Sequence, residues 1–305
     1  MSEKVKCGIV GAGVFGGYHA NKLVAHPRID FIGVYDASVP RAQSLAVKHN
    51  VRAFEGFEAL LAEIDAVIIA APARFHGELA IQALEAGKHC LIEKPIASQL
   101  EQARMIVELS LANKLIVQIG HQERFVAKAI GLDKVPERPL AIEAQRLGPP
   151  TDRGADVSVT LDLMTHDLDM VLMLMGEMPD GTKGETRSEN TAFSDETRAR
   201  LTFANTRVTL TASRLAPAYK RVMEITYPSG RVSIDFNAKT LSHDSPFDLN
   251  ADFADNPIAK DSLGAATDSF VEAVLHGKPT IISAKDGYNA LKLALQIDGG
   301  ENAAS

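Results

Sequence analysis

The sequence contains little of what several classes of protein require. Its only two cysteines, Cys7 and Cys90, fall in segments predicted to be buried strands, where they are expected to serve as small core side chains. The longest apolar run, 66–73, is far too short to cross a bilayer, and the first residues lack the apolar core of a secretory signal. A net charge of −7 argues against a nucleic-acid partner. We therefore expect a cytoplasmic globular protein with no membrane or nucleic-acid partner.

The first 120 residues alternate between strand and helix patterns. Strands are expected at 5–10, 31–35, 51–54, 65–70, 89–92 and 115–119, with helices at 14–25, 40–49, 57–63, 75–86 and 98–113. The run 65–70 is apolar after its first residue, which suits a strand buried on both faces of a parallel sheet. Because right-handed crossovers place helices on both faces, we predict a doubly wound α/β domain of the Rossmann type.

The pattern changes after residue 121. An extended segment at 138–147 and a helix at 157–175 precede two hairpins, 197–213 and 224–236, and helices follow at 267–276 and 286–297. This succession predicts an α+β domain with an open, mostly antiparallel sheet. The expected division assigns 1–121 and 284–305 to the dinucleotide-binding domain and 122–283 to a substrate and oligomerisation domain.

A glycine-rich turn joins the first strand to the first helix. Gly11 allows a tight turn, Gly13 lets the backbone approach a pyrophosphate, and Gly16 lets the helix pack closely on the sheet. The pyrophosphate is then bound at the helix N-terminus, where unpaired N–H groups favour negative charge. With a strand before it and a helix after it, this motif predicts a dinucleotide site rather than a plain turn. The expected contacts are Gly11, Gly13, Val14, Phe15 and Gly16.

Asp36 ends the second strand and selects the cofactor. A carboxylate there accepts hydrogen bonds from the ribose hydroxyls and repels a 2′-phosphate, so NAD is preferred to NADP. Arg41 lies nearby and could either stack on the adenine or bind a phosphate.

Three strand ends meet on the side of the sheet where α/β proteins bind ligands. They are 70–72, 93–95 and 120–122. Lys94 precedes Pro95, which biases its backbone toward an extended conformation and directs the side chain toward the nicotinamide. An ammonium group there polarises a hydroxyl or carries a proton. The alternative is a surface lysine at a strand end.

Asp162 and His166 are four residues apart on a predicted helix and therefore share a face, with Asp169 three residues further on. A carboxylate beside an imidazole raises its basicity, so this histidine is a candidate proton acceptor. Two alternatives are a solvated helix-surface pair and a metal site. No further cluster of histidine and cysteine supports a metal, and none is expected.

Taken together, the motifs resemble the Gfo/Idh/MocA dehydrogenase family over nearly the whole chain. They are the glycine motif, Asp36, Pro72 with His76, Glu93-Lys94-Pro95, Gly120-His121 with Glu123-Arg124-Phe125, and Asp162 with His166. The resemblance implies that Lys94 is the catalytic lysine, His166 the proton-transferring histidine and Asp162 its substrate-binding partner. It also implies that the nicotinamide side is lined by Ala71, Pro72, His76, Glu93 and Gln122, and that the C-terminal sheet forms a homo-oligomer.

The resemblance extends to the branch that oxidises nucleotide-activated amino sugars. The expected function is oxidation of a secondary hydroxyl of a sugar or sugar nucleotide, with the 3-hydroxyl of UDP-N-acetylglucosamine as the most specific candidate. A diphosphate would be bound by arginines of the second domain, with candidates Arg146, Arg153, Arg214 and Arg221. Met164 stands where the family often has glycine and would narrow a pocket for a free sugar. The alternatives are a polyol or inositol dehydrogenase and a non-catalytic regulator that senses dinucleotide.

Overall fold

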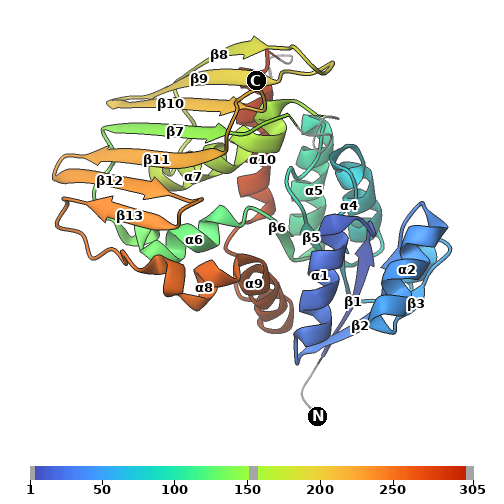
Figure 1. The fold of residues 1–305 in the computed structure, drawn as a ribbon. Coiled ribbons are helices and arrows are strands. Elements are labelled where there is room, and N and C mark those ends of the chain that lie inside the picture. The colour runs from blue at the N-terminus through green and yellow to red at the C-terminus, as the bar shows by residue number, and fades with distance from the viewer. Residues whose placement is uncertain (1–3, 151–156, 300–305) are drawn as a thin grey trace. The chain divides into compact units, whose positions relative to one another are not determined.

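The computed structural model describes residues 4–150 and 157–299, and the chain forms two compact units (Figure 1). The first unit comprises residues 1–122 and 262–288, and the second comprises 123–261 and 289–305. In the first unit the strands are β1 (Val5–Val10), β2 (Ile29–Tyr35), β3 (Arg52–Ala53), β4 (Ala66–Ile69), β5 (His89–Ile92) and β6 (Val117–Ile119). Its helices include α1 (Val14–Ala25), α2 (Val39–His49), α3 (Phe57–Leu61), α4 (His76–Glu85), α5 (Leu100–Asn113) and α9 (Ser262–His276).

The sheet of the first unit has the order β3-β2-β1-β4-β5-β6, and every strand pair in it is parallel. The chain proceeds outward from β1 on one side and returns to start again at β4 on the other. The order therefore reverses between β1 and β4, beside the glycine turn, where an open α/β sheet binds its ligand. Buried strands explain the apolar runs, since all four residues of β4 are fully buried. The predicted doubly wound sheet is confirmed.

Helix α9 belongs to the core of the first unit. Phe270 and Val271 pack in the same cluster as Val5 and Cys7 of β1. The side chain of Gln118 in β6 donates a 2.7 Å hydrogen bond to the carbonyl oxygen of Ala266. These contacts assign 262–283 to the first unit, whereas the sequence-based division assigned them to the second domain. Helix α10 (Ala284–Ile297) begins in the first unit and ends in the second.

The second unit is built on a seven-stranded sheet of order β13-β12-β11-β7-β10-β9-β8 (Figure 1). The strands are β7 (Ala141–Leu147), β8 (Gly181–Arg187), β9 (Glu196–Phe203), β10 (Thr206–Ser213), β11 (Lys220–Tyr227), β12 (Gly230–Asp235) and β13 (Thr240–His243). All neighbours are antiparallel except β7 and β10, which confirms an open, mostly antiparallel sheet. β9 alternates buried and non-buried residues because only one face is covered. The sequence pattern did not reveal β8, whose residues are polar or small.

Helices α6 (Glu123–Ile130) and α7 (Thr165–Met175) pack against each other in the second unit. The predicted regular helix at 157–175 is interrupted at its start, because Thr160–Met164 forms a π-helical turn before α7 begins. Such turns are rare and often occur at functional sites. The segment 244–260, expected to be a surface loop, includes a 3₁₀ turn (Phe253–Asp255) and the short α8 (Pro257–Lys260).

Candidate active site

The glycine turn after β1 has the geometry that a dinucleotide requires. Gly11 has φ of +99°, and a Cβ on it would lie 2.5 Å from the backbone nitrogen of Ala71. A Cβ on Gly16 would lie 1.9 Å from the carbonyl oxygen of Gly11, so α1 can approach the turn only without one. By contrast, a Cβ on Gly13 would meet nothing within 4 Å. The turn therefore leaves open space in front of Gly13, where a ligand backbone would lie.

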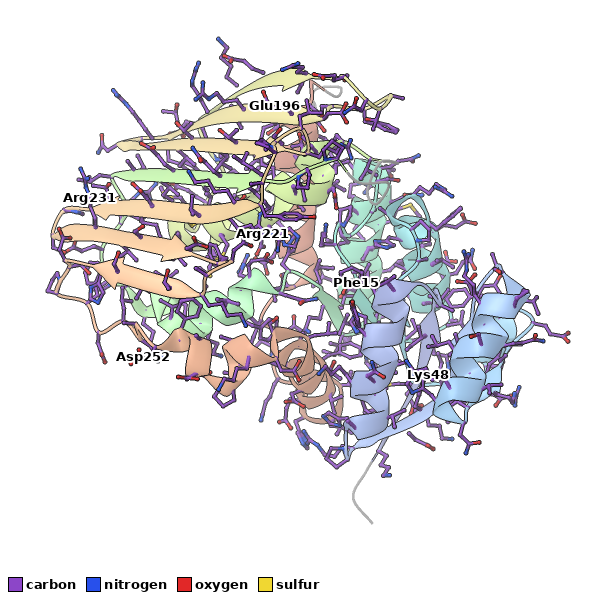
Figure 2. The ribbon with its side chains drawn as sticks, viewed as in Figure 1. Phe15, Lys48, Glu196, Arg221, Arg231 and Asp252 are labelled. Atoms are coloured by element: carbon purple, nitrogen blue, oxygen red, sulfur yellow. The ribbon has the colours of Figure 1, made fainter. Side chains whose placement is uncertain are left out.

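The N-terminus of α1 is available to an anion. Gly13 is the N-cap residue and provides no side-chain cap, and the first turn contains no acidic residue. Val14 and Phe15 form that first turn, and Figure 2 shows Phe15 at this end of α1. The backbone N–H groups and the helix dipole therefore both favour a phosphate at this position.

Asp36 links the second strand to the glycine turn. Its Oδ2 accepts a 2.7 Å hydrogen bond from the Ala12 N–H, and its Oδ1 accepts from the Ser38 N–H at 2.7 Å and from Arg41 at 3.0 Å. Burial would raise the pKa of Asp36, but these hydrogen bonds and the charge of Arg41 lower it below its usual value. Two donors already occupy Oδ1, so Oδ2 is the oxygen with an acceptor position for a ribose hydroxyl. The turn, the helix start and this carboxylate fit NAD, and a 2′-phosphate would be repelled.

The ends of β4 and β5 are held by buried polar side chains around Lys94. Both ring nitrogens of His76 lie 2.7 Å from a carbonyl oxygen, one from Ala71 and the other from Pro95, so this ring links the two strand ends. Lys94 is half-buried between Glu93 and Pro95, and the Lys94–Pro95 peptide bond is cis. The structure thus links His76 to Ala71 and to Pro95, the residue after Lys94, while Pro72 is exposed.

Glu93 is buried and has an internal partner. Its Oε1 pairs with Nε2 of His19 in α1 at 2.8 Å, and a Cβ on Gly120 would lie 3.0 Å from its Oε2. Burial would raise the pKa of Glu93, but His19 and the charge of Lys94 lower it below the usual value. Gln122, half-buried, accepts a 3.3 Å hydrogen bond from Ser262.

His166 lies in a network of charges in the second unit. Its Nδ1 lies 2.5 Å from Oε2 of Glu123, the first residue of α6. The other carboxylate oxygen of Glu123 accepts from Arg146 of β7 at 3.0 Å, and Arg146 also forms a two-point pair with Asp167 at 2.9 and 3.1 Å. The motif suggested Asp162 as the partner of His166. The structure adds Glu123, whose only signal in the sequence was its place after Gly120-His121.

Charges in this network compensate one another. Burial would raise the pKa of Glu123, but His166 and Arg146 hold it well below the usual value. Burial does raise the pKa of Asp167, although Arg146 opposes the shift. The pKa of Arg146 is raised by Asp167 and Glu123 in spite of burial. Glu123 is therefore an ionised partner that fixes the ring of His166.

Two other acidic residues, Asp162 and Asp169, lie just before α7 and on it. Asp162 is half-buried in the π-helical turn. Asp169, which spacing placed on the face of His166, is fully buried and forms a two-point pair with Arg124 of α6 at 2.7 and 2.8 Å. Met164 is fully buried. In residues 4–150 and 157–299 no group of three or more His, Cys, Asp or Glu side chains is arranged to hold a metal ion.

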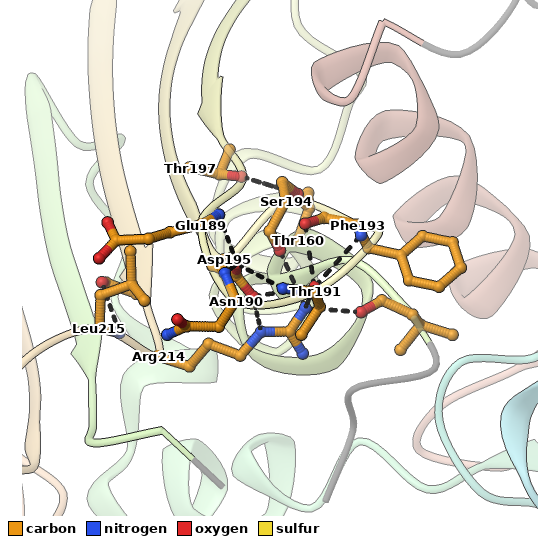
Figure 3. Close-up of polar contacts among 12 residues, drawn as sticks. Thr160, Glu189, Asn190, Thr191, Phe193, Ser194, Asp195, Thr197, Arg214 and Leu215 are labelled. Atoms are coloured by element: carbon orange, nitrogen blue, oxygen red, sulfur yellow. Dashed lines mark hydrogen bonds and ion pairs between the residues drawn. The ribbon is translucent and has the colours of Figure 1, made fainter. Parts of the chain in front are cut away.

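Of the four candidate arginines for a diphosphate, two are used inside the second unit. Arg146 belongs to the network above. Arg214 pairs with the fully buried Asp195 at 2.8 Å and donates to the carbonyl oxygens of Val157 and Ser194 (Figure 3). Asp195 in turn accepts from the backbone N–H groups of residues 189–191. This network orders a loop. Arg153 lies outside the described residues, and Arg221 is exposed at the start of β11.

Known proteins match the chain over nearly its whole length. Residues 5–121 match the family described as "Oxidoreductase family, NAD-binding Rossmann fold", and 141–233 match the "GFO/IDH/MocA C-terminal domain". The chain is 33% identical, over 96% of itself and 96% of that protein, to UDP-N-acetylglucosamine 3-dehydrogenase of Acidithiobacillus ferrooxidans. A crystal structure of the same enzyme superposes with a TM-score of 0.88 at 34% identity, covering 96% of each chain. The scyllo-inositol 2-dehydrogenase (NAD(+)) of Bacillus subtilis is 29% identical over 64% of this chain and 61% of that protein.

A parallel doubly wound domain with a dinucleotide turn, joined to an open-sheet domain, defines an NAD-binding oxidoreductase of two units. The chain belongs to the Gfo/Idh/MocA oxidoreductase family. It is an NAD-dependent dehydrogenase that acts on hydroxyl groups of sugars or related compounds, as predicted. In the described part of the chain, no helix has the length and apolar character needed to cross a membrane.

Proposed function

We propose that the protein oxidises the 3-hydroxyl of a UDP-activated amino sugar, with UDP-N-acetylglucosamine as the reference substrate. The observation that carries the proposal is the likeness to UDP-N-acetylglucosamine 3-dehydrogenase across 96% of both chains. The inositol dehydrogenases, in comparison, match in sequence over only 55–64% of this chain.

The proposed cofactor contacts follow the geometry of the first unit. The pyrophosphate is bound at the start of α1, and Asp36 with Arg41 lies at the adenosine ribose. The nicotinamide side comprises Ala71, Pro72, His76, Glu93, Lys94 and Gln122. When bound, NAD supplies the acceptor for the hydride that leaves the substrate carbon.

The proposed catalytic residues are Lys94, His166 and Asp162. The ammonium of Lys94 donates a hydrogen bond to the reacting hydroxyl oxygen and stabilises the negative charge that develops there. Glu123 holds Nδ1 of His166, so Nε2 is the ring nitrogen that accepts the hydroxyl proton. Asp162 binds a neighbouring hydroxyl. Loss of the proton to His166 and of the hydride to the cofactor leaves a ketone, which balances the reaction.

A substrate panel tests this function. The protein is incubated with NAD and UDP-N-acetylglucosamine, UDP-glucose, free N-acetylglucosamine or myo-inositol, and NADH absorbance is followed. Turnover should be fastest with UDP-N-acetylglucosamine, and a 3-keto sugar should appear by mass spectrometry. NADH formation from myo-inositol alone would favour the inositol dehydrogenases, whose partial match to this chain makes them the second candidate.

A lysine variant tests the catalytic role. Lys94→Ala should lower kcat by roughly 10²–10⁴-fold, the usual contribution of a positioned acid or base, while NADH binding is retained. Lys48→Ala, which removes an exposed lysine of α2, is the matched control. Wild-type turnover by Lys94→Ala would instead support a regulator that only binds the dinucleotide.

We also propose that the open face of the seven-stranded sheet forms a homo-oligomer. Its outward residues, among them Glu143, Arg198 and Glu224, are polar and exposed, while the opposite positions are buried. Light scattering on the purified protein should give a multiple of the 32.8 kDa chain mass. A monomer at micromolar concentration would contradict the proposal.

A further inference from the structure

An exposed arginine at the start of β11 and an exposed tyrosine just before that strand lie close together. Arg221 lies opposite Arg146 of the neighbouring β7 in the antiparallel register. Tyr219 precedes Arg221 by two residues and is close enough to act on its charge through space. The ring of Tyr219 rests against Gly148, where an added Cβ would lie only 2.9 Å from it. Figure 2 shows Arg221 at this end of β11.

Among the residues that the structure describes, no direct partner neutralises the positive charge of Arg221. Within residues 4–150 and 157–299, its guanidinium has no ion pair or hydrogen bond, although Glu123 and Asp167 are close enough to act on it through space. Those two carboxylates are in contact with Arg146. Burial and the charge of Arg146 both lower the pKa of Arg221. A guanidinium that is partly desolvated beside another cation gains most from an added anion.

Tyr219 provides an aromatic surface next to this cation. Its side chain is among the most exposed large apolar groups, at 61%. One edge of the ring contacts the backbone at Gly148, which holds the ring in place while most of its surface stays exposed. A flat, supported ring of this kind binds a nucleobase or ribose by stacking.

The position of the pair relates it to catalysis. Arg221 lies beside Arg146, which contacts Glu123, and Glu123 contacts His166 at 2.5 Å. All of these residues belong to the second unit. An anion bound by Arg221 is therefore connected, through Arg146 and Glu123, to the residue proposed to accept the substrate proton.

We propose that Arg221 and Tyr219 form the nucleoside diphosphate subsite, in which Arg221 binds phosphate oxygens and Tyr219 stacks on the base or ribose. The proposal rests on the proposed function and assigns the site that binds the nucleotide end of the substrate. It selects Arg221 from the arginines considered above, because Arg146 and Arg214 already have internal carboxylate partners.

The test compares Arg221→Gln with Arg231→Gln, which removes an exposed arginine from the adjacent β12. For UDP-N-acetylglucosamine, Arg221→Gln should raise KM by roughly 10–100-fold, as expected for lost charge-assisted hydrogen bonds, and leave kcat within about threefold. The inhibition constant of UDP should rise by the same factor.

Tyr219→Ala should raise both constants by roughly 5–30-fold, corresponding to about 1–2 kcal/mol of stacking. Arg221→Lys should recover part of the loss, which excludes misfolding as the cause.

Failure of the subsite and failure of the proposed function give different results. Unchanged KM and UDP inhibition in Arg221→Gln, with wild-type oxidation of UDP-N-acetylglucosamine intact, would overturn the subsite alone. If the wild type oxidises no UDP-sugar, calorimetry with UDP still tests the subsite. UDP binding that Arg221→Gln abolishes and Arg231→Gln keeps would support it, whereas no UDP binding to the wild type would overturn it.

Discussion

The glycine turn of the first unit and the His166 network of the second are built in different ways. The turn depends on backbone atoms that are close in sequence, such as Gly11 and Gly16, whose approach leaves no space for a Cβ. The network depends on charges from three separate elements, represented by Glu123, Arg146 and His166. Steric exclusion decides which residues the glycine turn accepts, whereas charge balance decides which residues the network accepts.

This difference sets how each region should respond to substitution. A steric contact of 1.9 Å cannot be relieved by rotating a side chain, so one methyl group should disrupt the turn. An ion-pair network tolerates replacement as long as no buried charge is left alone. Four sets of substitutions test this contrast, from the largest expected effect to the smallest.

Gly16→Ala should abolish dinucleotide binding, with a loss of roughly 100-fold or more, because the new methyl group would displace α1 from the turn. NADH fluorescence titration measures the effect. Gly17→Ala is the control, since a Cβ there would meet nothing within 4 Å. Equal losses in the two variants would show that the close approach at Gly16 is not the cause.

Arg124→Met should destabilise the protein by about 3–5 kcal/mol, because it leaves the buried carboxylate of Asp169 without its two-point partner. Urea unfolding measures the change. The double variant Arg124→Met/Asp169→Leu should recover much of the loss, because neither charge remains. A double variant no more stable than the single one would contradict charge balance as the governing factor.

Asp36→Ser should shift the cofactor preference toward NADP by roughly 10–100-fold in the ratio of kcat/KM values, about 1.4–2.7 kcal/mol. Removing the carboxylate ends its repulsion of a 2′-phosphate and releases Arg41, now 3.0 Å away, to bind it. Steady-state kinetics with both cofactors measures the ratio. Adding Arg41→Ala should cancel the gain for NADP, and a gain that persists would locate the 2′-phosphate elsewhere.

Glu123→Gln should make the free energy of unfolding depend less on pH in the acid range. The pKa of Glu123 is depressed in the folded state, so its contribution is fully present above the ordinary value of about 4.5 and is lost as pH falls through the depressed value. The wild type should therefore be more stable than the variant by the largest margin at neutral pH, and this difference in the free energy of unfolding should disappear in acid. Urea unfolding from pH 7 to pH 3 measures it. A gap that is independent of pH would mean that the ionised carboxylate is not the source of the stability.

The local pattern of apolar and polar residues was sufficient to predict much of the fold. The alternation of apolar strands and helices predicted the doubly wound sheet, and the turn expected at Asn205-Thr206 indicated the hairpin between β9 and β10, whose turn lies one residue earlier. It was insufficient where the determining contact is distant in sequence. Polar β8 is a strand because it pairs with β9, and α9 joins the first unit because Phe270 packs with β1.

The sequence by itself determined the dinucleotide turn and the family, because these depend on glycine conformation and on motifs a few residues long. The tertiary structure decided the partners of those residues: Glu123 at the ring of His166, Arg124 on Asp169, His19 on Glu93. Side-chain spacing along one helix reports which residues share a face, but a buried charge is paired by whichever opposite charge the packing of other elements brings within reach.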